Sequence, residues 1–246
     1  MFNVNRDPGT VTRKVKRKWK AFEQIDVDTK DLTDIPHYWV DMRRKGLPMW
    51  QYTARDVRTG VVFLGYSVER SMINSKIFIQ YIAEYLIKNG VELSQVRWQT
   101  DNGSEFIGSY NAKKRCAVTV TIEDGYNSIH NRIPPSASTY NSDVETFHRL
   151  IEDEFFDIEG FGSMDDFMFK IRTYNILFNN FRTNSYKENK SPLQILKEIA
   201  PEIDTKVTLL PPINGALLYS APLIGMRYYV LILMKGDTMY MVSPKI

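Results

Sequence analysis

The sequence has little of the two residue types that build disulfide frameworks and structural zinc sites. It contains one cysteine, Cys116, and three histidines among 246 residues. A single cysteine excludes a disulfide framework within the chain. So few cysteine and histidine donors also argue against a structural zinc site.

Long apolar runs are missing as well. No segment approaches the roughly 20 apolar residues that a membrane span requires, and no signal-peptide pattern opens the chain. We therefore expect an intracellular protein without a membrane partner. Hydrophobic residues make up 43% of the sequence and charged residues 25%, which is ordinary for a folded protein. The length is sufficient for one substantial core and a smaller appendage.

The formal net charge of +3 is too small to indicate nucleic-acid binding by itself, but positive charge is concentrated at the amino terminus. Within residues 1–20 the only acid is Asp7, and the basic residues are Arg6, Arg13, Lys14, Lys16, Arg17, Lys18 and Lys20. Such an arm suits phosphate neutralisation with release of counterions. Lys14, Arg17 and Lys18 are therefore candidate DNA contacts, and a solvated terminus is the equal alternative.

An apolar run that ends in an acidic turn organises the middle of the chain, WQTDNGSEF at residues 98–106. Residues 96–100 indicate a short buried strand, Asn102-Gly103 is a strong turn dipeptide, and residues 104–106 open a helix. Asp101 is thus expected at the carboxyl end of a strand, where α/β proteins place their working groups. Glu105 is expected to be a first-turn carboxylate favoured by the helix dipole.

Two further segments carry carboxylates that could approach Asp101. Residues 23–28 alternate polar with apolar side chains and predict a strand with Asp26 and Asp28 on one face. Residues 141–150 place a capping residue before a helical pattern, and Glu145 flanks its apolar stripe. The members of that stripe are Val144, Phe147, Ile151 and Phe155.

These segments resemble the catalytic core of the DDE transposases and retroviral-type integrases, most closely that of bacterial insertion-sequence transposases. The resemblance runs over residues 19–156, and its specific motifs are TDNGSEF and N-x-x-V-E-x-F-H. Carried over by position, it implies that Asp26, Asp101 and Glu145 are the catalytic and metal-binding triad. Asp28, on the same face as Asp26, is the alternative ligand. Thr146 and Ser142 stand where many relatives have arginine and glycine, and the interval between Asp101 and Glu145 is longer than usual.

The resemblance also implies the chemistry. Asp26 would bridge two Mg²⁺ or Mn²⁺ ions, with Asp101 on one ion and Glu145 on the other. Activated water would cleave a transposon end, and the freed 3′-hydroxyl would attack target DNA. The expected partners are transposon-end and target DNA, with a homo-oligomer assembled on them, in the bacterial cytoplasm and at the nucleoid during action.

Further candidate DNA contacts surround these motifs. They are Asn102, Lys113, Lys114, Tyr140, Asn141, His148 and Arg149. A structural role inside the protein is the alternative for His148, and a solvated face is the alternative for the two lysines. Two other functions remain open, a catalytically inactive transposase-derived DNA-binding protein and an RNase H-type nuclease. Retention of all three carboxylates argues against the inactive DNA-binding protein, because a site without catalytic function would gain nothing from keeping three mutually repelling charges.

The predicted fold is α/β, an RNase H-like mixed sheet flanked by helices with a small C-terminal β extension. Strands are predicted at 23–28, 49–56, 61–68, 96–100 and 117–122, helices at 71–89, 164–181 and 192–199, and a terminal hairpin at 228–234 and 238–242. Residues 29–48 are an insertion with a short helix, and Asp56 belongs to a turn. The predicted domains are a basic arm (1–20), the catalytic core (21–200) and a partial β module (201–246).

Overall fold

The structure, a computed structural model, describes residues 16–108, 114–133, 141–215, 232–235 and 238–241. The chain divides into two units, Met1–Gly215 and Ala216–Ile246. None of the helices in the described residues is both long enough and apolar enough to cross a membrane.

In the described part of the first unit, six strands form one mixed sheet in the order β5-β4-β1-β2-β3-β6. Strands β1, β2 and β3 pair antiparallel, β4 and β5 continue parallel to β1, and β6 lies parallel to β3. The bounds are Gln24–Asp31 (β1), Trp50–Asp56 (β2), Val62–Ser67 (β3), Arg97–Thr100 (β4), Ile129–Arg132 (β5) and Ile213–Asn214 (β6). The predicted RNase H-like mixed sheet is confirmed.

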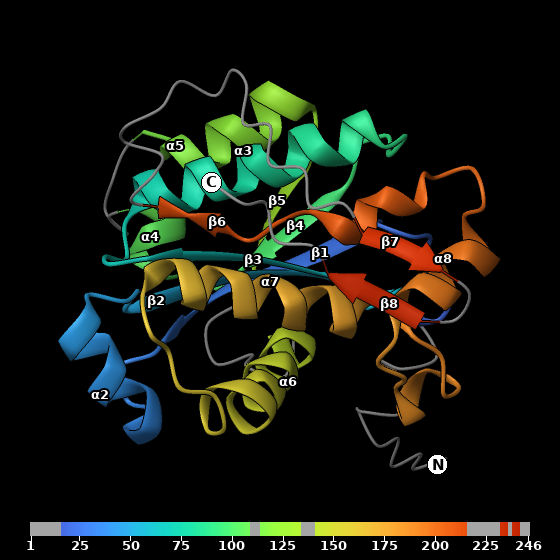
Figure 1. The fold of residues 1–246 in the computed structure, drawn as a ribbon. Coiled ribbons are helices and arrows are strands. Elements are labelled where there is room, and N and C mark those ends of the chain that lie inside the picture. The colour runs from blue at the N-terminus through green and yellow to red at the C-terminus, as the bar shows by residue number, and fades with distance from the viewer. Residues whose placement is uncertain (1–15, 109–113, 134–140, 216–231, 236–237, 242–246) are drawn as a thin grey trace, which may run out of the picture. The chain divides into compact units, whose positions relative to one another are not determined.

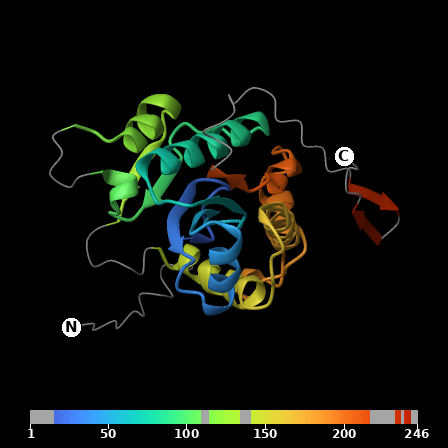
Figure 2. The same cartoon turned by 60° about the vertical axis from the view of Figure 1, so that its left-hand side comes forward.

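Helices cover both faces of this sheet (Figures 1 and 2). Helices α3 and α5 lie on one face, and α6 and α7 lie on the other with α2 beside them. The bounds are Pro36–Lys45 (α2), Met72–Lys88 (α3), Ser104–Ile107 (α4), Ala117–Val120 (α5), Ser142–Ile151 (α6), Met164–Asn180 (α7) and Pro192–Ile199 (α8). The helices predicted at 71–89, 164–181 and 192–199 and the short helix in the insertion are confirmed. Single turns complete the set at Thr121–Gly125 (η1), Glu152–Phe156 (η3), Ser185–Lys187 (η4) and Thr205–Leu209 (η5).

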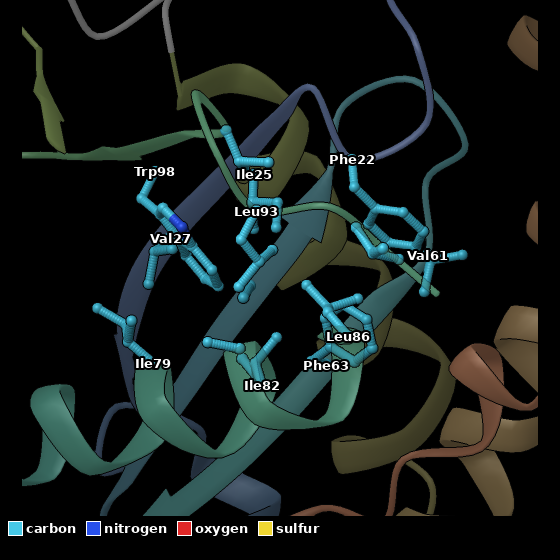
Figure 3. Packing of buried hydrophobic residues seen from close by; sticks show 14 of the residues in the cluster. Phe22, Ile25, Val27, Val61, Phe63, Ile79, Ile82, Leu86, Leu93 and Trp98 are labelled. Carbon is cyan, nitrogen blue, oxygen red and sulfur yellow. The ribbon is translucent and has the colours of Figure 1, made fainter. Parts of the chain in front are cut away.

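The first core lies between the sheet and α3. Ile25 and Val27 of β1 pack toward Ile79, Ile82 and Leu86 of α3 (Figure 3). Because successive side chains of a strand point to opposite faces, this packing turns the residues between them toward α6. Asp26 and Asp28 therefore face the second core, which α2, α6 and α7 build with Val62, Leu64 and Tyr66 of β3.

Asp56 is a turn residue, as predicted. Its side chain accepts hydrogen bonds from the backbone N–H and hydroxyl of Thr59 and from the backbone N–H of Phe22. The carboxylate thus closes the turn between β2 and β3 and anchors the backbone of Phe22, two residues before β1 begins. All of these partners are local to the turn or the strand entrance, away from the carboxyl end of β1.

The strand predicted at 117–122 is wrong, because this segment is helical. Helix α5 covers Ala117–Val120 and continues into the wider turn η1. The Cys116 side chain accepts the backbone N–H of Thr119 and caps the helix, and Val118 and Ile122, four residues apart, are both fully buried in the first core. The fifth strand is β5, which lies outside the strands predicted from the sequence.

The C-terminal residues contribute one strand to the main sheet and two strands to a separate pair. Strand β6 joins the main sheet beside β3, so the first unit extends to Gly215, past the predicted core end at residue 200. In the second unit, β7 (Ile232–Lys235) and β8 (Thr238–Met241) form an antiparallel pair. The predicted terminal hairpin is confirmed over these residues, whereas residues 228–231 and 242 of the prediction lie outside the described part of the chain.

Candidate active site

The pairing of β1 with β4 decides which aspartates meet. The two strands are parallel, and their register places Asp26 beside Gln99 and Val27 beside Thr100. One step further along both strands, Asp28 comes level with Asp101. The carboxyl ends of two adjacent parallel strands thus bring Asp28, rather than Asp26, beside Asp101.

Asp28 lies among acidic side chains, and its own side chain is 17% exposed. Burial is the largest cause that raises the pKa of Asp28 to about 7, and the charges of Asp101, Glu145 and Glu105 contribute to the rise. The backbone hydrogen bond from Thr29 opposes it. Carboxylates that disfavour each other's ionisation must lie within electrostatic reach. Asp101 after β4, Glu105 of α4 and Glu145 of α6 therefore lie within electrostatic reach of Asp28.

Asp101 and Glu105 are linked through the turn that follows β4. Burial raises the pKa of Asp101, the Gly103 N–H at 2.9 Å from its Oδ1 lowers it, and Glu105 raises it again. Glu105 is buried rather than solvated, and its Oε1 accepts the hydroxyl of Thr29 at 2.8 Å. Its Oε2 is buried without a hydrogen-bond partner, while Arg70 approaches Oε1 at 3.6 Å.

Glu145 reaches the site from α6. Val144, Phe147 and Ile151 are fully buried, as the apolar stripe predicts, and leave Glu145 exposed on the flank of the helix. The start of α6 is tied to the sheet by a hydrogen bond of 2.6 Å from the Arg55 guanidinium to the Asp143 carbonyl. Lys16 of the amino-terminal segment forms an ion pair with the Asp143 side chain.

Asp26 occupies a different environment, fully buried beneath α6. Its Oδ1 accepts hydrogen bonds from Gln24 Nε2 at 2.8 Å and Gln99 Nε2 at 3.0 Å, and its Oδ2 is buried without a partner. Burial raises the pKa of Asp26 to about 7. The negative charge of Asp143 adds to this rise, and the positive charges of Lys16 and Arg55 oppose it. Asp26 thus lies two residues before Asp28 on β1, beside Gln99 rather than level with Asp101.

The donor set at the edge fits a hard divalent cation in its chemistry. Such ions prefer carboxylate oxygens. The pKa values of Asp28 and Asp101 are raised and Glu105 Oε2 has no hydrogen-bond partner, so a nearby cation would stabilise the ionised forms of these carboxylates. In the described residues, no three His, Cys, Asp or Glu side chains are gathered closely enough to hold an ion as they stand.

The candidate DNA contacts fall into three groups. Arg17, Lys18, Asn102, Lys114 and Arg149 are exposed. Asn141 and His148 are buried, so the structure places neither on the surface, and Asn141 makes no side-chain capping bond to α6. Lys14, Lys113 and Tyr140 lie outside the described residues.

The sheet order, the helices on both faces and the acidic edge define an α/β protein of the RNase H-like fold class. A solved structure with a similar course of the chain is the catalytic core domain of BIV integrase, at 13% sequence identity and a TM-score of 0.47. The match covers 72% of this chain and 95% of that one. No family model and no curated protein matches the chain.

Proposed function

We propose that this chain is the catalytic core of a DDE-type DNA transposase or integrase. In this reading it is a metal-dependent DNA endonuclease and strand transferase. The observation that supports the proposal is the register of β1 and β4, which sets Asp28 level with Asp101, within electrostatic reach of Glu145 on a segment far away in the sequence. Structural roles are a poor explanation for such a cluster, because mutual repulsion costs stability.

The proposed roles follow from position. The charges of both Asp101 and Glu145 raise the pKa of Asp28, so we assign Asp28 as the ligand shared by two metal ions. Asp101 would bind one of these ions and Glu145 the other. Bound Mg²⁺ or Mn²⁺ would activate water, or the 3′-hydroxyl of the cleaved DNA end, for attack and would stabilise the leaving oxygen. The Gly103 N–H holds one oxygen of Asp101 and leaves the other free for a ligand role.

Phosphate contacts would come from the exposed cations around this edge. Arg17, Lys18, Lys114 and Arg149 are available for them, and each contact would add to the salt dependence of binding. We propose transposon-end and target DNA as the partners, with several copies of the chain assembled on them. Action on chromosomal DNA would place the protein at the nucleoid in the cytoplasm.

The test compares two substitutions on the same strand face. With the full chain, plasmid DNA and Mn²⁺, Asp28→Asn should reduce nicking by a factor on the order of 100 or more, since a lost metal contact costs several kcal/mol of transition-state stabilisation. Asp26→Asn is the matched control and should nick within a few-fold of the wild type. Loss of nicking in Asp26→Asn alone would return the ligand role to Asp26. Full activity in both variants would refute the proposal.

A second candidate is an RNase H-type nuclease acting on RNA–DNA hybrids. Glu105 favours it, because that class places a further carboxylate in the site and Glu105 is buried beside Asp28 and Asp101. The N-x-x-V-E segment of α6 favours the DNA transposase or integrase over the RNase H-type nuclease. Cleavage of a labelled hybrid and of the matching DNA duplex under the same conditions separates the two functions.

A further inference from the structure

A chain of buried polar side chains leads from the second core to Asp28. The Tyr66 hydroxyl donates to Gln51 Oε1 at 2.9 Å, and Gln51 Nε2 donates to Thr53 Oγ1 at 2.9 Å. Thr53 Oγ1 lies 2.9 Å from His148 Nε2. On the other side of the imidazole, His148 Nδ1 lies 3.9 Å from Asp28 Oδ2.

The surroundings of the ring favour one tautomer of His148. Thr53 Oγ1 accepts a hydrogen bond from Gln51 Nε2, and its own hydrogen is available to donate to His148 Nε2. With Nε2 as the acceptor, a neutral imidazole carries its hydrogen on Nδ1, the nitrogen that faces the Asp28 carboxylate. The ring is only 8% exposed, which disfavours a charge on it.

The second buried histidine has the opposite arrangement. The Thr100 hydroxyl donates to the Asp101 carbonyl at 2.9 Å, so its oxygen accepts from His130 Nε2 at 3.0 Å. Thr119 Oγ1 lies 2.8 Å from His130 Nδ1 and donates to it. His130 therefore carries its hydrogen on Nε2, and it serves as an internal reference for His148.

We propose that His148 is a positioning residue for the site, whose Nδ1–H is aimed at the Asp28 carboxylate by the chain of Tyr66, Gln51 and Thr53. The inference rests on the proposed function, in which Asp28 is a metal ligand. The separation of 3.9 Å exceeds a hydrogen bond, and a small movement of either side chain closes it. Groups that hydrogen-bond a ligating carboxylate orient it and support metal affinity.

The first test reads the tautomers directly. In protein labelled with ¹⁵N-histidine, two-bond proton–nitrogen correlation spectra should show the Nδ1–H form for His148 and the Nε2–H form for His130. Thr53→Val removes the donor to Nε2 and should shift His148 toward the Nε2–H form. An Nε2–H form of His148 in the wild type would overturn the proposal.

The second test measures Mn²⁺ binding by calorimetry in two variants of similar volume. His148→Asn keeps a nitrogen donor near the position of Nδ1, whereas His148→Gln keeps a polar group near Nε2 only. The dissociation constant should rise about 10-fold or more in His148→Gln, as for lost partners of metal ligands, and stay within about 3-fold of the wild type in His148→Asn.

The outcomes separate the two proposals. Wild-type protein that binds no Mn²⁺, or binds it equally well as Asp28→Asn, would refute the proposed metal site. Wild-type binding that depends on Asp28, together with equal dissociation constants in the two His148 variants, would overturn the positioning role alone. Thermal unfolding of each variant identifies one that fails to fold, and the tautomer measurement on the wild type decides the inference in that event.

Discussion

At the residue scale, the two aspartates of β1 show how side chains on one face of a strand can lie in different environments. Asp26 and Asp28 are two residues apart and point the same way, so alternation in the sequence treats them alike. Their difference comes from the neighbouring strand, which sets Gln99 beside Asp26 and Asp101 level with Asp28. Register between strands far apart in sequence is a tertiary property, and the local pattern does not contain it.

The environment of Asp26 leads to a prediction about stability and pH. Burial raises the pKa of Asp26 from its ordinary value of 3.8 to about 7 in the folded protein. For a carboxyl with a raised folded pKa, the stabilisation is complete below the unfolded pKa and is lost as pH rises through the folded pKa. Asp26→Asn cannot ionise and still accepts from Gln24 and Gln99, so it should gain stability over the wild type between pH 4 and pH 7, by about 1 kcal/mol per pH unit.

Urea unfolding of both proteins at pH 4.5 and pH 8 measures this difference. Asp204→Asn is the control, because Asp204 is exposed and its pKa is lowered by the Lys206 backbone N–H. It should give no gain at pH 8. Parallel stability profiles of the wild type and Asp26→Asn would show that Asp26 is not held in a desolvated site.

At the scale of elements, prediction succeeded where the signal is local. The β2–β3 hairpin has strand-forming residues around a turn closed by Asp56, and α3 has helical periodicity with Ser71 as its cap. Residues 117–122 are rich in β-branched side chains, yet they form a helix because Val118 and Ile122 bury the same face in the first core. Strand β5 was missed because its sequence, IHNR, is polar and its pairing with β4 is long-range.

The packing of α3 on the sheet can be tested at Gly65 of β3. A Cβ at this position would lie 2.8 Å from the Phe78 ring and 2.9 Å from Ile213 Cγ2, so α3 and β6 leave no room for one. Gly65→Ala should lower the free energy of unfolding by about 1–3 kcal/mol, the usual cost of overpacking. Gly125→Ala is the matched control, since nothing lies within 4 Å of its added Cβ, and it should stay within about 0.5 kcal/mol of the wild type. Equal stability of both variants would mean that α3 shifts at little cost.

At the scale of the whole molecule, the site combines local motifs with a long-range arrangement. The motif TDNGSEF places Asp101 directly after β4 and Glu105 in the first turn of α4, and the stripe of α6 places Glu145 on its flank, all as the sequence predicts. The choice of Asp28, the burial of Glu105 and the inward position of His148 depend on how β1, β4 and α6 assemble. Short motifs predict which residue types take part in the proposed chemistry, whereas the assembled sheet determines which of those residues lie near one another.

That assembly predicts how divalent ions change the stability of the folded chain. Ions that bind only the folded state stabilise it by about 2.7 kcal/mol at 100 times their dissociation constant, or roughly 5–10 °C in Tm for a chain of this size. Mn²⁺ should raise the Tm of the wild type and of Asp26→Asn equally, because Asp26 lies outside the cluster. Asp28→Asn should begin with a higher Tm near pH 8, since it relieves the repulsion with Asp101 and Glu145, and should respond little to Mn²⁺. Scanning calorimetry measures these Tm values. If Mn²⁺ raises the Tm of Asp28→Asn as much as that of the wild type, the ions bind elsewhere on the molecule.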